Sequence, residues 1–157
     1  MVVVFALGLG WLTFRAPIRL ICMEIQEFCS PDGVQNEVLR ERAQVGGRGQ
    51  CTRQYVVIEH ETEIGLLVMD LFPDKAYAFL YEVFVLKEYR LRGIGGRILD
   101  TAEKLARKNG YRELYVDVVP LDSDYSQDRL VKWYEQRGYK PRSHRPNEMA
   151  KELASTT

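Results

Sequence analysis

The sequence predicts a single domain of the α/β (α+β) class, in which a mixed β-sheet is flanked by helices. Strand-like segments rich in β-branched and apolar residues alternate with segments whose apolar residues recur at helical spacing, in the order β-α-β-β-β-α-β-α-β. The length of 157 residues suits one domain with a substantial core. A hydrophobic fraction of 46% and a charged fraction of 28% are typical of globular proteins.

The chain opens with an apolar run, MVVVFALGLGWLTF, that no basic residue precedes. This run is too short to span a bilayer, and the FRAPIR that follows is a poor signal-peptide cleavage site. We therefore expect residues 1–17 to form an extra strand or an N-terminal extension of one domain that spans residues 1–157.

The next segments predict a strand, a helix and a loop. Residues 18–28 mix β-branched and apolar residues with polar ones, as a strand does. Residues 30–44 predict a helix with Ser30 as its N-cap and Pro31 in the first helical position. The glycine-rich, basic stretch 45–54 predicts a loop rather than a phosphate loop, because no Lys-Ser and no helix follow its glycines.

The middle of the chain predicts three antiparallel strands followed by a helix. Residues 55–72 fold back at EHETE as a hairpin, and residues 76–86 continue the meander after the turn PDK. The apolar residues of 98–110 recur at helical spacing, and KNG ends that helix.

The C-terminal part predicts one more strand, one more helix and a final strand or strand pair. Residues 112–119 read as a strand. Residues 122–138 begin with capping residues and end on Gly138, as a helix does. Residues 139–153 supply the last strand or strand pair.

Composition and charge narrow the class of function. Basic and acidic residues balance at 22 each, which argues against a dedicated nucleic-acid binder. The three cysteines form no C-x-x-C pair, and the two histidines have no metal-ligand spacing. We expect free thiols in a reducing cytoplasm, no disulfide framework and no metal.

The stretch YRLRGIGGR (89–97) crowds three glycines and three arginines between a strand and a helix. It lacks the Lys-Ser/Thr of a Walker loop, and position 98 is isoleucine where a dinucleotide fingerprint needs glycine. What remains is glycine backbone able to approach a ligand, with free N–H groups at a helix N-terminus that suit an anion. The alternative is a tight turn whose arginines lie in water.

Two motifs resemble the GNAT superfamily of acyl-CoA-dependent N-acyltransferases. R-L-R-G-I-G (90–95) fits the family signature [RQ]-x-x-G-x-[GA], and LVKWYEQRGYKP (130–141) resembles the family's [FLW]-Y-E-x-x-G-[FY] segment. The resemblance covers roughly residues 18–153. It implies a centrally splayed sheet in which acyl-CoA lies between two parallel strands, here 79–86 and 112–119.

The resemblance also implies which residues hold acetyl-CoA. The backbone of Val83 and Val85 is expected to pair with the pantetheine amides. Backbone N–H groups of the turn are expected to cradle the pyrophosphate, with Arg92 or Arg97 near the ribose phosphate. The implied turn residues are Arg90, Leu91, Arg92, Gly93, Ile94, Gly95, Gly96 and Arg97. Gln127 stands where the family often has a CoA-contacting Asn.

Acyl transfer to an amine needs a neutral amine, a stabilised carbonyl oxygen and a protonated leaving thiolate. Tyr134 matches the family tyrosine near the CoA sulfur, so the resemblance implies a general acid; its structural alternative is an aromatic anchor beside Trp133. Glu82 is the one charged residue in the apolar run 76–86, and is either the base or a structural carboxylate. Asp117 and Glu135 are weaker candidates.

The resemblance implies an N-acetyltransferase that moves an acetyl group from acetyl-CoA to the primary amine of a small molecule, by direct attack in a ternary complex. The alternatives are an acetyltransferase of protein N-termini or lysines, and a non-catalytic CoA-binding module. Retention of the tyrosine favours the enzyme. The expected partners are acetyl-CoA and an amine acceptor, without nucleic acid or membrane, and a homodimer is left open.

Overall fold

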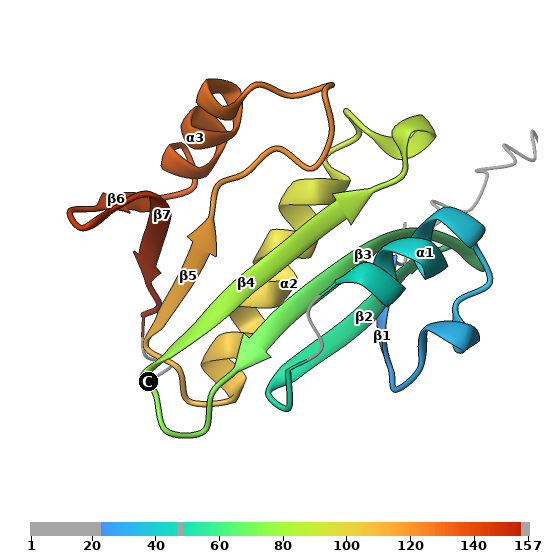
Figure 1. The fold of residues 1–157 in the computed structure, drawn as a ribbon, viewed down its shortest axis with the longest axis horizontal. Helices are drawn as coiled ribbons and strands as arrows, with labels where there is room; N and C mark the ends of the chain where they lie inside the picture. Colours follow the sequence, from blue (N-terminus) through green and yellow to red (C-terminus); the bar gives the residue numbers. More distant parts are fainter. Residues whose placement is uncertain (1–22, 47–48, 155–157) are drawn as a thin grey trace, which may run out of the picture.

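The structure, a computed structural model, describes residues 23–46 and 49–154 (Figure 1). The expectations for residues 1–17 and for the start of the first strand lie outside these residues. Of the helices in the described ranges, none is long and apolar enough to cross a membrane.

Seven strands of the described chain form one sheet in the order β1-β2-β3-β4-β5-β7-β6. Neighbouring strands are antiparallel except β4 and β5, which are parallel, so the predicted mixed sheet is confirmed. The strands are β1 (Met23–Phe28), β2 (Thr52–Glu59), β3 (Thr62–Leu71), β4 (Tyr77–Val85), β5 (Glu113–Asp117), β6 (Lys140–Arg142) and β7 (Arg145–Glu152).

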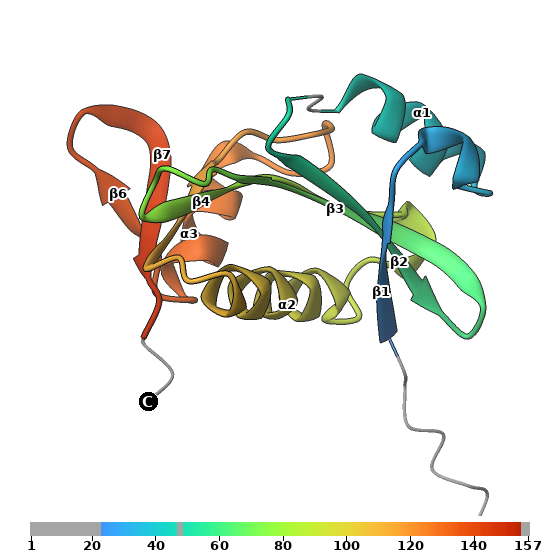
Figure 2. The same cartoon turned by 90° about the horizontal axis from the view of Figure 1, so that it is seen from below.

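Helices cover both faces of this sheet, as Figure 2 shows for α1 and α2. The helices are α1 (Glu37–Val45), α2 (Ile94–Lys108) and α3 (Gln127–Glu135). α2 and α3 share the larger apolar core with one face of the sheet, and α1 packs with a smaller core on the other face. The two faces of β4 therefore meet different helices.

The predicted helix 30–44 is divided in two, which corrects its start. Ser30 does cap a turn, because its hydroxyl accepts the N–H of Asp32, but that turn is a 3-10 helix ending at Gly33. α1 begins after Asn36, whose side chain accepts the N–H of Leu39. The Glu63 carboxylate accepts the N–H groups of residues 35 and 36 at 3.1 and 2.7 Å. These two N–H groups are therefore not available for hydrogen bonds within one continuous helix. 

The hairpin expected at EHETE is confirmed. β2 and β3 are joined at His60 and Glu61, both with positive φ (49° and 64°), as a tight hairpin turn requires. β2 begins at Thr52, inside the expected loop 45–54, because the Thr52 hydroxyl bonds to Asp70 across the strand pair at 2.5 Å.

Two predicted helix boundaries also shift. α2 begins at Ile94 rather than at residue 98, since the last two glycines of the turn belong to its first turn. α3 begins at Gln127, capped by Ser126, rather than at residue 122. The expected final strand pair is present as β6 and β7.

One extra residue in β4 decides which side chains face which core. Leu80 lies opposite Met69 of β3, and Glu82 lies opposite Val68, so Tyr81 has no partner and forms a bulge. Leu80 and Val83 consequently pack on the α2 side, although they are three residues apart.

Candidate active site

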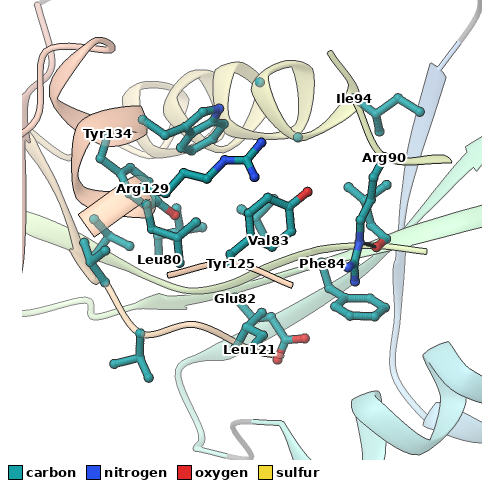
Figure 3. Close-up of a pocket in the computed structure, with 18 of the residues that line it drawn as sticks. Leu80, Glu82, Val83, Phe84, Arg90, Ile94, Leu121, Tyr125, Arg129 and Tyr134 are labelled. Carbon is teal, nitrogen blue, oxygen red and sulfur yellow. Dashed lines mark hydrogen bonds between the residues drawn. The ribbon is translucent and has the colours of Figure 1, made fainter. Parts of the chain in front are cut away.

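β4 and β5 separate at the end of their shared register, which is the splay that the resemblance implies. Their parallel pairing runs from Tyr77 and Glu113 to Leu80 and Val116, and β4 then continues alone to Val85. A cavity of about 560 Å³ opens between the separated ends. Both strand ends, the N-terminus of α2, α3 and the loop after β5 line it (Figure 3).

The backbone of β4 presents polar groups to this cavity. The Leu86 N–H donates to the Ile64 carbonyl of β3 at 2.9 Å, so in an antiparallel ladder the groups of Phe84 also point to β3. The groups of Val83 and Val85 point the other way, toward the gap. The Val85 carbonyl accepts the Arg90 Nε–H at 2.9 Å, which leaves the Val85 N–H and both groups of Val83 facing the cavity.

The glycine turn forms the end of the cavity beyond β4. A short 3-10 helix (Lys87–Tyr89) follows β4, and Gly93, with φ of 75°, starts α2 in the left-handed conformation. The first backbone N–H groups of α2, from residues 94 to 96, precede any intrahelical acceptor. Free N–H groups at a helix N-terminus suit an anion, and the residues that line this end of the cavity include Leu91, Gly93, Ile94, Gly95 and Gly96.

The three arginines of the turn lie in three different environments. Arg97 pairs with Glu59 of β2 at 3.3 Å. Arg92 donates to the Glu88 carbonyl at 2.8 Å and lies over the Tyr89 ring. Neither is among the residues lining the cavity, whereas Arg90 is. In the sequence the three arginines form one cluster, and their different roles become visible only from their tertiary contacts.

Arg90 joins the two sides of the splay. Its guanidinium, 12% exposed, pairs with Asp122 at 2.6 Å and with Asp124 at 2.7 Å in the loop after β5. Its Nε–H donates to the Val85 carbonyl of β4. Burial alone would raise the pKa of Asp122, but the hydrogen bond and charge of Arg90 hold that pKa below its usual value. Arg90 is thus a tie between strand and loop.

Tyr134 projects from α3 into the cavity, on the side of β4 that α2 covers (Figure 3). It is 8% exposed and packs edge-on against Trp133 and Tyr139. Burial raises the pKa of its phenol, and the nearby charge of Arg137 opposes this rise only in part. The phenol therefore keeps its proton at neutral pH.

Four residues of the α3 side line the cavity and were not predicted as site residues: Arg129, Leu130, Trp133 and Arg137. Arg137 stacks on the Trp133 ring at 3.9 Å, and a Cβ atom on Gly96 would lie 3.0 Å from its guanidinium. Arg129 reaches into the cavity toward Tyr125, with its guanidinium 5.1 Å from that ring (Figure 3). The spacing of four residues from Arg129 to Trp133 on α3, and from Trp133 to Arg137 just after it, was the signal that could have identified these three.

The two remaining predicted residues lie away from Tyr134. Glu82, 8% exposed, lies on the opposite side of β4, and its carboxylate accepts the Arg42 Nε–H at 2.5 Å. Gln127 donates its amide to Asn147 of β7 at 2.9 Å and does not line the cavity. Glu82 therefore borders the cavity from the α1 side, and Gln127 is a link between α3 and the sheet.

Comparisons with known proteins agree with this geometry. The family model described as "Acetyltransferase (GNAT) domain" matches residues 51–141. No curated protein matches the chain. Among solved structures, the chain is similar to a GNAT family acetyltransferase from Elizabethkingia anophelis with acetyl-CoA bound (13% identity, 83% of this chain and 98% of that one, TM-score 0.61).

Two further structures are similar over most of their length. An IAA acetyltransferase from Bacillus cereus matches at 16% identity, over 84% of this chain and 100% of that one, with a TM-score of 0.64. The ribosomal-protein-S18-alanine N-acetyltransferase from Escherichia coli matches at 13% identity, over 87% and 97%, with a TM-score of 0.62. At such identities the likeness concerns the fold.

Proposed function

The chain belongs to the GNAT acetyltransferase family and is an acyl-CoA-dependent N-acetyltransferase, and from this premise we propose that it acetylates the primary amine of a small molecule by direct attack in a ternary complex. The observation that carries the proposal is the splay itself. Backbone groups of β4, the N-terminus of α2 and a buried phenol all meet in one cavity open to solvent.

The donor acetyl-CoA is proposed to enter between α2 and α3. Its pyrophosphate binds the free N–H groups at the start of α2, where the helix dipole favours negative charge. Arg137 lies beside that helix end and supplies a second positive group. The pantetheine chain then lies along β4 as an added strand and uses the backbone groups of Val83.

In the reaction, the amine nitrogen forms a bond to the acetyl carbon while the bond from that carbon to sulfur breaks. The Val85 N–H donates to the carbonyl oxygen as it gains negative charge. Tyr134 gives its proton to the leaving sulfur, since burial keeps the phenol protonated. Glu82 borders the other side of the gap and takes the proton that the attacking amine nitrogen loses, while Arg42 fixes its orientation. Exchange with solvent then returns Glu82 and Tyr134 to their starting protonation states.

Release of free CoA thiol from acetyl-CoA, measured with a thiol reagent over a panel of amines, tests the proposal. Gly95→Val is expected to abolish acetyl-CoA binding in calorimetry, because its side chain points toward Trp133 across the cavity. Gly33→Val is the matched control, since nothing lies within 4 Å of the added Cβ there. Normal binding by Gly95→Val, or acetylation of peptides alone, would contradict the proposal.

Glu82 has its own test. Glu82→Gln keeps the size of the side chain but removes its charge, so we expect a lower kcat with little change in the dissociation constant of acetyl-CoA. The two steps are read separately, by thiol release and by calorimetry. An unchanged kcat together with a lower melting temperature would show that Glu82 is only the structural partner of Arg42.

A further inference from the structure

The α1 side of the splay has an apolar rim that the family assignment does not explain. We call it the acceptor mouth and define it as Phe79, Tyr81, Val119 and Leu121, all of which line the cavity. Three of them are large hydrophobic side chains that are exposed to solvent: Tyr81 is 51% exposed, Val119 49% and Leu121 42%. Phe79 and Tyr81 belong to β4, and Val119 and Leu121 to the loop after β5, so the rim has members on both sides of the opening.

This mouth faces away from the proposed cofactor groove. Glu82 and Phe84 of β4 point to the α1 side, where Arg42 lies over the Phe84 ring at 4.1 Å. Figure 3 shows Glu82 and Leu121 on the other side of β4 from Tyr134. If acetyl-CoA fills the α2 and α3 side, an attacking amine reaches the acetyl carbon through the acceptor mouth.

The charges around the mouth are almost fully paired. Glu82 pairs with Arg42, while Asp122 and Asp124 are held by Arg90, and Lys87 adds a further contact to Asp124 at 3.2 Å. The exception is Asp117 at the end of β5, which lines the cavity, is exposed and has no ion pair among the described residues. One free carboxylate suits one ammonium group.

This pattern discriminates between classes of amine. A polyamine or an aminoglycoside carries several positive charges and needs an excess of carboxylates, which the mouth lacks. An acceptor that carries a phosphate or carboxylate needs a free cation on this side, where Arg42 and Arg90 are both engaged. Arg129, which has no ion pair among the described residues, lies on the Tyr134 side of β4 instead (Figure 3). An apolar body, by contrast, gains free energy by covering the exposed rim.

We propose that the acceptor is a primary monoamine with an aromatic or alkyl body. Asp117 attracts its single ammonium group, and its apolar part packs on Phe79, Tyr81 and Leu121. The proposal rests on the acetyl transfer proposed above and specifies its acceptor. It makes the acceptor mouth the part of the molecule that determines specificity.

Thiol-release kinetics of the full chain at saturating acetyl-CoA test this with four amines of matched reactivity: 2-phenylethylamine, hexylamine, ethanolamine and spermidine. We expect kcat/KM for the first two to exceed that for ethanolamine by about tenfold or more, since each buried methylene contributes to binding. A preference for spermidine or ethanolamine would overturn the acceptor class while leaving acetyl transfer standing. No thiol release with any amine, despite acetyl-CoA binding in calorimetry, would contradict both proposals.

Variants of single residues test whether the acceptor mouth causes the preference for apolar amines. Leu121→Ser and Tyr81→Ser are expected to raise KM for 2-phenylethylamine severalfold and to leave KM for acetyl-CoA unchanged. Val38→Ser is the matched control, because Val38 is equally exposed on α1 but does not line the cavity. Asp117→Asn should raise KM for the amine about two- to fivefold at low salt and less at high salt. Equal effects of the Val38 and Leu121 variants would overturn the assignment.

Discussion

The two ends of the β4–β5 pair differ in what holds them together. At the closed end, the strands pair through their backbones, Tyr77 stacks on Tyr115 at 4.3 Å, and the Arg112 N–H donates to the Ala76 carbonyl. At the open end no backbone pairing between β4 and β5 remains, and the side chain of Arg90 joins the end of β4 to the loop after β5 instead. A side chain can bridge a gap that backbone pairing would close, and Arg90 does so at the edge of the cavity.

Two neighbouring buried tyrosines, with ring centroids 5.3 Å apart, both have a raised pKa, but the two phenols have different surroundings. Tyr139 donates to the buried Glu103 carboxylate at 3.2 Å, which Lys151 also contacts at 2.8 Å. Burial raises the pKa of Tyr139, and the charge of Glu103 raises it further. Tyr134 instead faces the cavity. One phenol is committed to the fold and the other is available for chemistry.

The largest expected effect comes from removing the two phenols in turn. Tyr134→Phe should lower kcat by about 10²-fold or more, as loss of a general acid does, with the dissociation constant of acetyl-CoA nearly unchanged. Tyr139→Phe should leave kcat intact and reduce the free energy of unfolding by about 1–3 kcal/mol, because Glu103 loses a hydrogen bond. Thiol release and urea denaturation of both variants check this. A large loss of acetyl-CoA affinity in Tyr134→Phe would make that tyrosine a structural anchor.

A smaller effect on kcat is expected when the contacts of Arg90 at the open end are removed. Arg90→Gln removes both ion pairs to the loop after β5, so the Val85 N–H is held less firmly and kcat should fall about 10- to 100-fold. The dissociation constant of acetyl-CoA should change less than about threefold. Arg53→Gln, which breaks only an exposed ion pair to Glu27, is the control.

The outcome separates two roles of Arg90. A tenfold or greater loss of acetyl-CoA affinity with kcat intact would make Arg90 a phosphate ligand, as the sequence motif first suggested, rather than a positioning residue. Arg90→Lys sharpens the result, because a lysine keeps the charge but cannot reach the β4 carbonyl and both carboxylates together.

The smallest expected effect is on stability at alkaline pH. The pKa of Tyr134 and of Tyr139 is raised in the folded chain, whereas an unfolded tyrosine ionises near pH 10. The unfolded state therefore releases protons first, and the free energy of unfolding falls as pH rises above about 10. Urea denaturation between pH 8 and 11 measures the slope. Tyr139→Phe should flatten it, Tyr81→Phe should not, and the reverse would contradict the assignment.

The sequence identified the parts of the fold whose signals are local. The hairpin at His60, the strand before the glycine turn and the helix after it were all predicted, because alternation, helical spacing and glycine act within a few residues. The break before α1 was missed, since it depends on Glu63, which lies 27 residues from Asn36. Helix caps can be predicted from neighbours, but not when a distant carboxylate competes for the same N–H groups.

The candidate site also depends on contacts between residues that are distant in the sequence. The motif placed Arg90 correctly beside the turn, but its partners Asp122 and Asp124 lie more than thirty residues away, so a tie was not predictable. Arg137 was different, because its spacing of four residues from Trp133 within the predicted helix 122–138 already indicated that the two side chains meet, although α3 itself ends at Glu135.

Because of the bulge at Tyr81, the number of residues between Leu80 and Val83 decides which side of the sheet each following side chain of β4 faces. Loops usually tolerate a residue gained or lost, and so do most strand ends. Between Leu80 and Val83 a change of one residue would invert every later position of β4, turning Glu82 toward α2 and presenting the polar backbone of Val83 and Val85 to β3. A residue gained or lost in a surface loop can therefore leave the site intact, whereas one gained or lost in this short interval cannot.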